Sequence, residues 1–163
     1  MFFTTLSYLK FLLKSTNQHG VHSPFVFSFV TKGLYQKKTK TVSFDAYPQL
    51  KELSKKQKRI LSKILIYFKI ATIDFDVVQF SKKRNTYKLL YINKTKELKK
   101  INTTGFDAKH IILVDHLHQT KTSLEDWHQF ISNTEGIVTI DLFYFGLIFF
   151  RTAQAKEHFR IRV

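Results

Sequence analysis

The stretch Ile111-Ile112-Leu113-Val114-Asp115 decides the fold of this chain. Its four consecutive aliphatic residues predict a strand that is covered on both faces, as in a parallel sheet flanked by helices. The acid that follows would lie at the carboxyl end of a central strand, where open α/β sheets bind their ligands. Asp115 is therefore the first candidate for a ligand or partner contact, and a turn or helix-cap acid is the alternative.

The residues after this strand predict one helix and two further strands. Thr122-Ser123-Leu124-Glu125 has the form of a capping box, and a helical stripe of apolar residues follows it. The apolar blocks 138–143 and 146–150 predict an antiparallel pair, and residues 152–163 are expected to form a tail.

The residues before the strand complete an α/β order of elements. Strands are expected at 71–78 and 87–92, and a short helix at 95–100. A long amphipathic helix is expected at 49–68, and a helix that Gly33 stops begins after Ser23-Pro24. The prediction is a reduced Rossmann-like sheet of about five mixed strands with a C-terminal antiparallel pair, preceded by N-terminal helices. We expect a single domain, 1–163, with a helical appendage at 1–45 and the α/β core at 46–163.

Composition narrows the classes of protein that fit. The chain has 163 residues, of which 44% are hydrophobic, so it can bury a core. It has no cysteine, which excludes disulfides and thiolate zinc sites. No apolar run reaches the length of a membrane span, and the charges of the first 14 residues follow the apolar ones, unlike a signal peptide. We expect a docking helix there, no membrane-spanning segment, and a cytoplasmic location.

The net charge of +15 is concentrated in two segments. Residues 32–63 hold ten Lys or Arg and two acids, and residues 82–100 hold eight and one. In the expected helix at 49–68 the basic side chains lie opposite the apolar ones: Lys51, Lys55, Lys56, Lys58, Arg59 and Lys63. Such a face is either an ordinary solvated surface or a patch that binds phosphate, nucleic acid or anionic lipid.

Three motifs give the chain a resemblance to a known family. The first is Asn17-Gln18-His19-Gly20-Val21-His22-Ser23-Pro24-Phe25, the second is Val114-Asp115-His116-Leu117-His118 with Trp127 in the helix after it, and the third covers 139–151 with 154–163. They resemble the class I S-adenosylmethionine-dependent methyltransferases, and more closely the small methyltransferase-like proteins of Bacteroidetes-type bacteria.

The cofactor half of that family is missing here. The resemblance implies a glycine-rich loop after the first strand, which lets the backbone approach the methyl donor. The matching residues 73–80 hold no glycine, and the chain up to Tyr87 is too short for the helix, strand and helix that would supply the ribose-binding acid. We therefore predict no cofactor, with S-adenosylmethionine expected only if an atypical site replaces this loop.

The acids of the later strands also depart from the family. Asn93-Lys94 replaces an acid-glycine pair, and His116 replaces the second acid of the turn after Asp115. One carboxylate does not make a divalent-cation site, so we predict no metal. No nucleophile motif occurs, and no catalytic residue is assigned.

The histidines are the other chemical candidates. His118 follows the acid-ended strand, and His19 and His22 flank the turn after the first helix. Each is predicted to contact a ligand or partner near the carboxyl edge of the sheet, or to hydrogen-bond structural neighbours.

These departures favour a methyltransferase-like binding or scaffold protein without catalytic activity. Its partner would be another copy or a methyltransferase-like relative that pairs with an exposed strand edge. Two alternatives stay open: a methyltransferase with an atypical cofactor site, and a basic adaptor for nucleic acid or an anionic surface.

Overall fold

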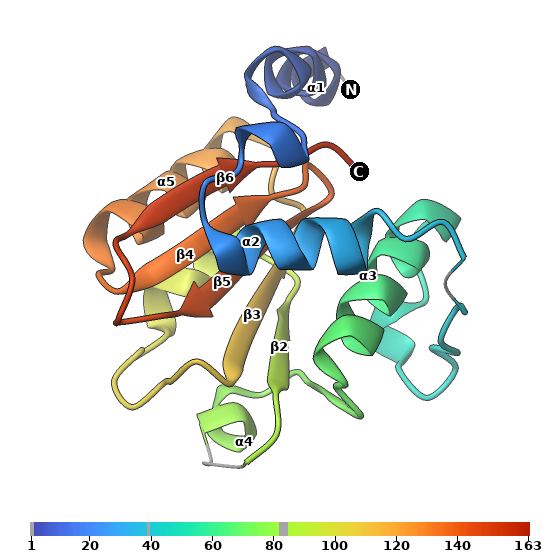
Figure 1. Ribbon diagram of the computed structural model, residues 1–163, viewed down its shortest axis with the longest axis vertical. Coiled ribbons are helices and arrows are strands. Elements are labelled where there is room, and N and C mark those ends of the chain that lie inside the picture. Colours follow the sequence, from blue (N-terminus) through green and yellow to red (C-terminus); the bar gives the residue numbers. More distant parts are fainter. Residues whose placement is uncertain (1, 39, 82–84) are drawn as a thin grey trace.

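The computed structural model describes residues 2–38, 40–81 and 85–163. Its centre is a mixed six-stranded sheet in the order β1-β2-β3-β5-β4-β6 (Figure 1). β5 is antiparallel to its neighbours β3 and β4, while β1–β2, β2–β3 and β4–β6 are parallel pairs. The strands are β1 (Ile73–Asp74), β2 (Lys88–Ile92), β3 (His110–Asp115), β4 (Ile137–Asp141), β5 (Phe145–Phe150) and β6 (Glu157–Arg160).

The predicted α/β fold and its C-terminal antiparallel pair are confirmed, but the sheet has six strands rather than about five. The additional strand is β6, which lies in the expected tail and pairs with β4. Its sequence, Glu157-His158-Phe159-Arg160, has one apolar residue. The hydrophobic pattern therefore does not reveal it, because an edge strand is only partly covered.

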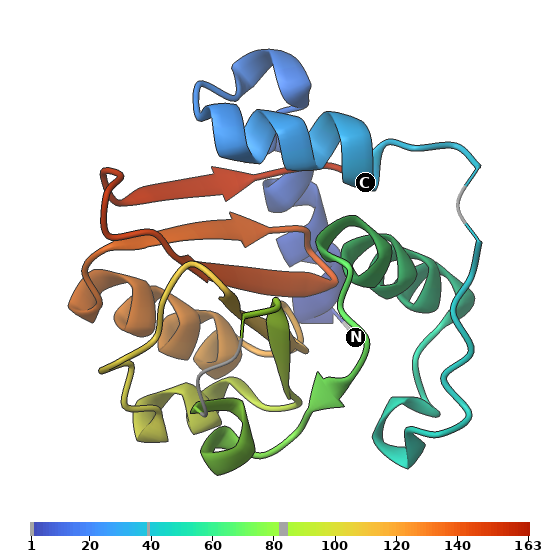
Figure 2. The same ribbon diagram turned by 60° about the horizontal axis from the view of Figure 1, so that its bottom comes forward.

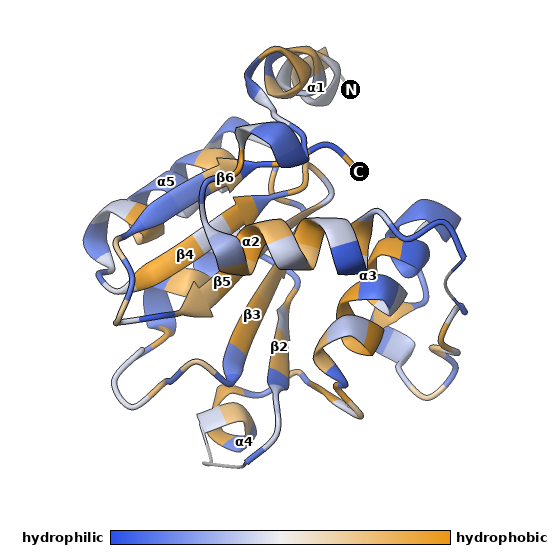
Figure 3. Ribbon diagram, viewed as in Figure 1, coloured by the Kyte–Doolittle hydropathy of each residue, from blue (hydrophilic) through white to orange (hydrophobic). Residues whose placement is uncertain are grey.

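Successive residues of β3 face two different hydrophobic cores. Ile111 and Leu113 belong to the core under α2 (Pro24–Phe29) and α3 (Lys55–Phe68), and Ile112 and Val114 belong to the core under α5 (Lys121–Asn133). Figure 2 shows α2 and α5 on opposite sides of the strands. In Figure 3 the central strands are mainly hydrophobic, with hydrophilic residues where β2 and β3 begin, while the helices also carry hydrophilic residues. Coverage of both faces explains the unbroken aliphatic run.

The N-terminal helices pack against the rest of the chain. The ring of Phe29 lies 5.0 Å from that of Phe68 and 6.0 Å from that of Phe149. Helix α1 (Phe2–Lys14) lies beyond the strands at the top of Figure 1. Its Tyr8 and Phe11 contact Phe143, with ring centroids 4.8 and 5.5 Å apart. Residues from the predicted appendage thus share a core with the sheet.

The strand expected at 71–78 is wrong in its length. β1 ends at Asp74, and the short helix α4 (Val77–Ser81) follows. Asp76 starts this helix, since its Oδ1 accepts hydrogen bonds from the backbone N–H groups of Val78 at 2.7 Å and Gln79 at 3.1 Å. The aspartate therefore ends the alternating pattern by capping a helix.

Two helix boundaries also differ from the prediction. α3 begins at Lys55, because Ser54 and Gln57 form a capping box, so Lys51 precedes the helix. α2 passes directly into the π-helix η2 (Val30–Leu34), and Gly33 lies inside it instead of stopping it.

The cap of α5 lies two residues before the predicted capping box. The side chain of Thr120 accepts a hydrogen bond from the backbone N–H of Ser123 at 3.0 Å. The short helix expected at 95–100 is the 3₁₀ helix η4 (Thr95–Lys100). Of the basic segment 82–100, residues 82–84 lie outside the described residues. Within the described chain, no helix has the length and apolarity needed to cross a bilayer.

Candidate functional site

The carboxyl ends of β3 and β4 carry two acids, of which the sequence predicts Asp115 as a contact residue but not Asp141. Asp115 ends β3 and Asp141 ends β4, and their pairing with β5 places both at the same edge of the sheet, opposite Phe145 and Gly146. Both acids are buried, each with 1% of its surface exposed. A buried carboxylate needs hydrogen-bond donors, so the partners of these two acids decide what the edge can do.

Asp115 is held by three donors from three parts of the chain. Its Oδ2 accepts a hydrogen bond from the hydroxyl of Tyr91 in β2. Its Oδ1 accepts from the backbone N–H of His116 at 2.7 Å and from the side-chain amide of Gln57 in α3 at 3.3 Å. Burial, together with the negative charge of Asp115, raises the pKa of Tyr91, which keeps this hydroxyl a donor. Asp115 therefore joins α3 to the sheet edge.

Asp141 is held by His118 in an arrangement that reaches α1. His118 Nε2 lies 2.9 Å from Asp141 Oδ2, and His118 Nδ1 lies 2.6 Å from the hydroxyl oxygen of Ser7. In the neutral imidazole, Nε2–H donates to the carboxylate and Nδ1 accepts from the serine. The ring of Phe143 stacks on His118 at 4.7 Å.

A serine, a histidine and an acid in this order also form the relay of nucleophilic hydrolases. Here Ser7, in α1, is 6% exposed, and its hydroxyl oxygen lies against Nδ1 of the His118 ring. These three residues link α1 to the carboxyl end of β4, and the side chain of Ser7 is buried in that contact.

The other two predicted contact residues, His19 and His22, lie on the connection between α1 and α2 and are exposed. The structure thus places Asp115 and His118 in the buried edge of the sheet, and His19 and His22 on the surface. The four predicted contacts do not form one buried cluster.

Aromatic rings line the segment that follows β1. Phe75 directly follows β1, and its ring lies 5.6 Å from that of Tyr91 and 5.8 Å from that of Tyr47. The hydroxyl of Tyr47 also accepts a hydrogen bond from the backbone N–H of Ile73 at 3.3 Å. These aromatic side chains pack together beside the end of β1.

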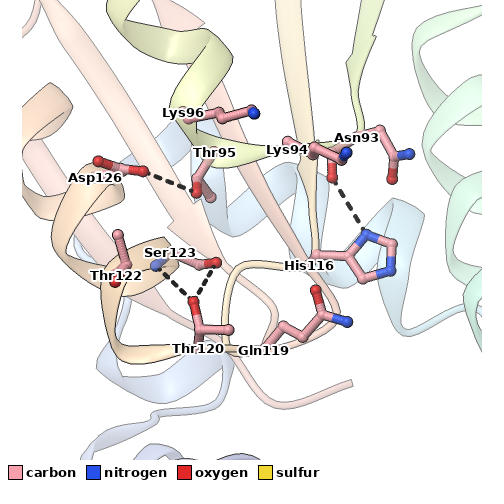
Figure 4. Close-up of a pocket in the computed structure, with 10 residues that line it drawn as sticks. All are labelled: Asn93, Lys94, Thr95, Lys96, His116, Gln119, Thr120, Thr122, Ser123 and Asp126. Carbon is pink, nitrogen blue, oxygen red and sulfur yellow. Dashed lines mark hydrogen bonds between the residues drawn. The ribbon is translucent and has the colours of Figure 1, made fainter.

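A cavity of about 470 Å³ lies beside this edge, between the ends of β2 and β3 and the start of α5 (Figure 4). Three hydrogen-bonded pairs are drawn there: Asp126 with Thr95 at 3.3 Å, the hydroxyls of Thr120 and Ser123 at 2.8 Å, and His116 Nδ1 with the backbone oxygen of Asn93 at 3.3 Å. Asp126 also forms an ion pair with Lys99 at 2.7 Å. Its lining is Asn93, Lys94, Thr95, Lys96, His116, Gln119, Thr120, Thr122, Ser123 and Asp126. Such a lining suits a small polar molecule.

A larger cavity, of about 860 Å³, lies between α3, the end of η2 and residues 162–163, and we call it the basic groove. Its lining is Leu34, Tyr35, Lys37, Lys55, Lys56, Arg59, Ile60, Lys63, Arg162 and Val163. Six of these residues are basic and none is acidic. Burial and the charge of Arg59 lower the pKa of Lys63, because both disfavour its ammonium form.

The structure divides the predicted basic patch. Lys55, Lys56, Arg59 and Lys63 line the basic groove, while Lys51 and Lys58 line a different cavity, near Tyr47 and Pro48. Sequence reasoning missed Lys37 and Arg162 as members of the groove. Lys37 lies in the basic segment 32–63 but outside the predicted helix, and Arg162 lies far from α3 in the chain, so the helical pattern at 49–68 could include neither.

Within the described residues, no three His, Cys, Asp or Glu side chains are grouped as metal ligands. His118 is engaged with Ser7 and Asp141, while His116 is exposed and its Nδ1 lies 3.3 Å from the backbone oxygen of Asn93.

Comparison of the chain with protein-family models, curated proteins and solved structures gives no match.

Proposed function

We propose that the chain is a methyltransferase-like α/β domain that acts by binding, as a scaffold, and not by catalysis. One observation carries the proposal: the acids at the carboxyl ends of β3 and β4 are buried and used for internal hydrogen bonds. Asp115 accepts a hydrogen bond from Gln57 of α3, and Asp141 is linked through His118 to Ser7 of α1. An α/β enzyme of this kind keeps that edge open for its ligands.

The first strand supports the same proposal. β1 has two residues, and a phenylalanine and a capped helix follow it where the resemblance implies a glycine-rich loop. The resemblance to methyltransferases rests on the sequence motifs around Asn17, Asp115 and the last strands, and it remains part of the proposal. The cytoplasm is the proposed location.

The proposed partner is another copy or a methyltransferase-like relative, bound through a strand edge. β6 is an edge strand, and its last part is already covered: Thr16 N donates to the carbonyl of Arg160 at 2.8 Å, and Arg162 N donates to the carbonyl of Thr16 at 3.2 Å. On this side of the sheet, the edge available to a partner is therefore the first half of β6, Glu157 and His158, while the opposite edge is the two-residue strand β1.

Calorimetric titration with S-adenosylmethionine and S-adenosylhomocysteine tests the proposal. An active class I methyltransferase serves as the control. We expect no binding at cofactor concentrations up to 1,000 times those that saturate the control. This difference corresponds to a loss of about 4 kcal/mol in binding free energy. Stoichiometric binding in the range of the control would overturn the proposal and favour the alternative, an active enzyme with an atypical cofactor site.

A second candidate function is the binding of an anionic molecule or surface, such as nucleic acid. The specific observation is the basic groove, in which none of the six cations forms an ion pair with an acid among the described residues. Electrostatic binding of this kind weakens steeply as salt rises. We expect Lys55→Glu with Arg59→Glu to abolish salt-sensitive retention on single-stranded DNA, and retention equal to wild type would exclude the candidate.

A further inference from the structure

The basic groove has two chemically different parts. Leu34 and Ile60 are 2% and 4% exposed and form an apolar floor, to which Tyr35 and Val163 add partly buried surface. The six cations surround that floor. A ligand that fills the groove must therefore match hydrocarbon and positive charge together.

Two of the cations, Arg59 and Lys63, are held in place by backbone carbonyls and not by acids. The ammonium of Lys63 donates to the carbonyl oxygen of Leu34, and Arg59 Nη2 donates to the carbonyl oxygen of Lys37 at 3.2 Å. Tyr35 donates its hydroxyl hydrogen to the carbonyl oxygen of Arg162 at 2.9 Å, which ties the end of the chain to the same groove. These carbonyls orient the cations without neutralising them, so their mutual repulsion remains.

The lining also indicates which anion fits. Apart from its Lys and Arg, which bind phosphate as well as guanine, it holds no Asn, Gln, Asp, Glu, Ser or Thr side chain that could pair with the edge of a nucleobase. Tyr35 is the one aromatic side chain of the lining, and a track of stacked bases needs several. Aliphatic floor residues instead match an alkyl chain, and Lys and Arg match a phosphate.

We propose that the basic groove binds a lipid phosphate, with the phosphate among the cations and the first part of the hydrocarbon chain on Leu34, Tyr35 and Ile60. This inference gives the second candidate function its ligand class and rests on that candidate. It does not depend on the methyltransferase-like proposal. The ligand is either a free lipid or a lipid of an anionic bilayer, since both present the same chemistry.

The test is calorimetric titration of the full chain with octyl phosphate, butyl phosphate and inorganic phosphate. Octyl phosphate is expected to bind at least tenfold more tightly than butyl phosphate, because four more methylene groups leave water. Equal affinities for all three would overturn the lipid inference and leave anion binding intact. Absence of binding by all three, with retention on DNA also absent, would overturn the anion-binding candidate as well.

Variants locate the site. The double variant Arg59→Glu with Lys63→Glu is expected to bind octyl phosphate at least tenfold more weakly than wild type. Lys100 is an exposed lysine of η4 outside the groove, and the control variant Lys100→Glu is expected to bind as wild type. If the first pair fails to fold by circular dichroism, Lys55→Glu with Lys56→Glu changes exposed groove residues instead. Unchanged binding by a folded groove variant would overturn the proposal.

Vesicles distinguish the two sources of the ligand. Phosphatidylcholine vesicles with and without phosphatidic acid are sedimented with the protein, and octyl phosphate is added as a competitor. Binding to the acidic vesicles that octyl phosphate displaces would support a bilayer lipid as the ligand. If the protein binds octyl phosphate but not vesicles, the result would support a free lipid as the ligand. If the protein binds acidic vesicles and saturating octyl phosphate does not reduce that binding, the result would overturn the groove as the site.

Discussion

Replacement of Asp115 by alanine is expected to lower the free energy of unfolding by about 3 kcal/mol, because it removes the acceptor of three hydrogen bonds. The hydroxyl of Tyr91 loses its partner inside the protein, since Tyr91 is 4% exposed. A buried donor left without a partner costs about 1–3 kcal/mol. Gln57 is half-buried and can turn to water, so it adds less.

Asp115→Asn is the matched control for this change. Asparagine keeps the size of the side chain and one acceptor oxygen, so a loss of about 1 kcal/mol is expected. Tyr91→Phe removes the donor instead of the acceptor, and a loss of about 2 kcal/mol is expected because the hydrogen bond is made to a charged group. In the double variant the losses should not add, since both changes remove the same interaction.

Urea unfolding followed by the fluorescence of Trp127 measures these energies, because the chain has one tryptophan and it is fully buried. A loss below about 0.5 kcal/mol for Asp115→Ala, or a gain in stability, would refute the reasoning. That result would mean that Asp115 is kept for a ligand and not for the docking of α3, and it would count against the proposed loss of catalysis.

Three further predictions concern the packing and the titration of the fold. Gly146→Ala would place a Cβ 2.8 Å from Cη2 of the buried Trp127, so a loss of about 2 kcal/mol in the free energy of unfolding is expected in urea titrations. Ser7→Ala removes the hydrogen bond to His118 and should speed amide exchange within α1 about fivefold, with β3 unchanged. Burial lowers the pKa of His158 from 6.5 to about 4, so the unfolded chain binds more protons between these values and stability falls as the pH drops. Between pH 7 and pH 5, His158→Gln should reduce the fall in the free energy of unfolding by about 2 kcal/mol. A pH profile of the unfolding free energy that equals that of wild type would contradict this prediction.

Local patterns predicted the elements whose cause is local. The aliphatic run at Ile111 predicted a doubly covered strand, because both faces of β3 meet a hydrophobic core. The apolar blocks that form β4 and β5 were also predicted as strands, and they form the expected antiparallel pair. The length of β1 and the start of α3 were misjudged, because Asp76 and Ser54 cap helices at points where the hydrophobic pattern continues.

The sequence by itself determined the α/β class, the position of Asp115 at a strand end, the absence of glycine from residues 73–80 and the excess of positive charge. Tertiary structure alone decided what these features do. Whether Asp115 and His118 face a ligand or a neighbouring helix depends on Gln57 and Ser7, which lie 58 and 111 residues away along the chain. The basic groove likewise needs Lys37 and Arg162 beside α3. Hydrogen bonds and charges act through space over a few ångströms, and only the folded chain sets those distances.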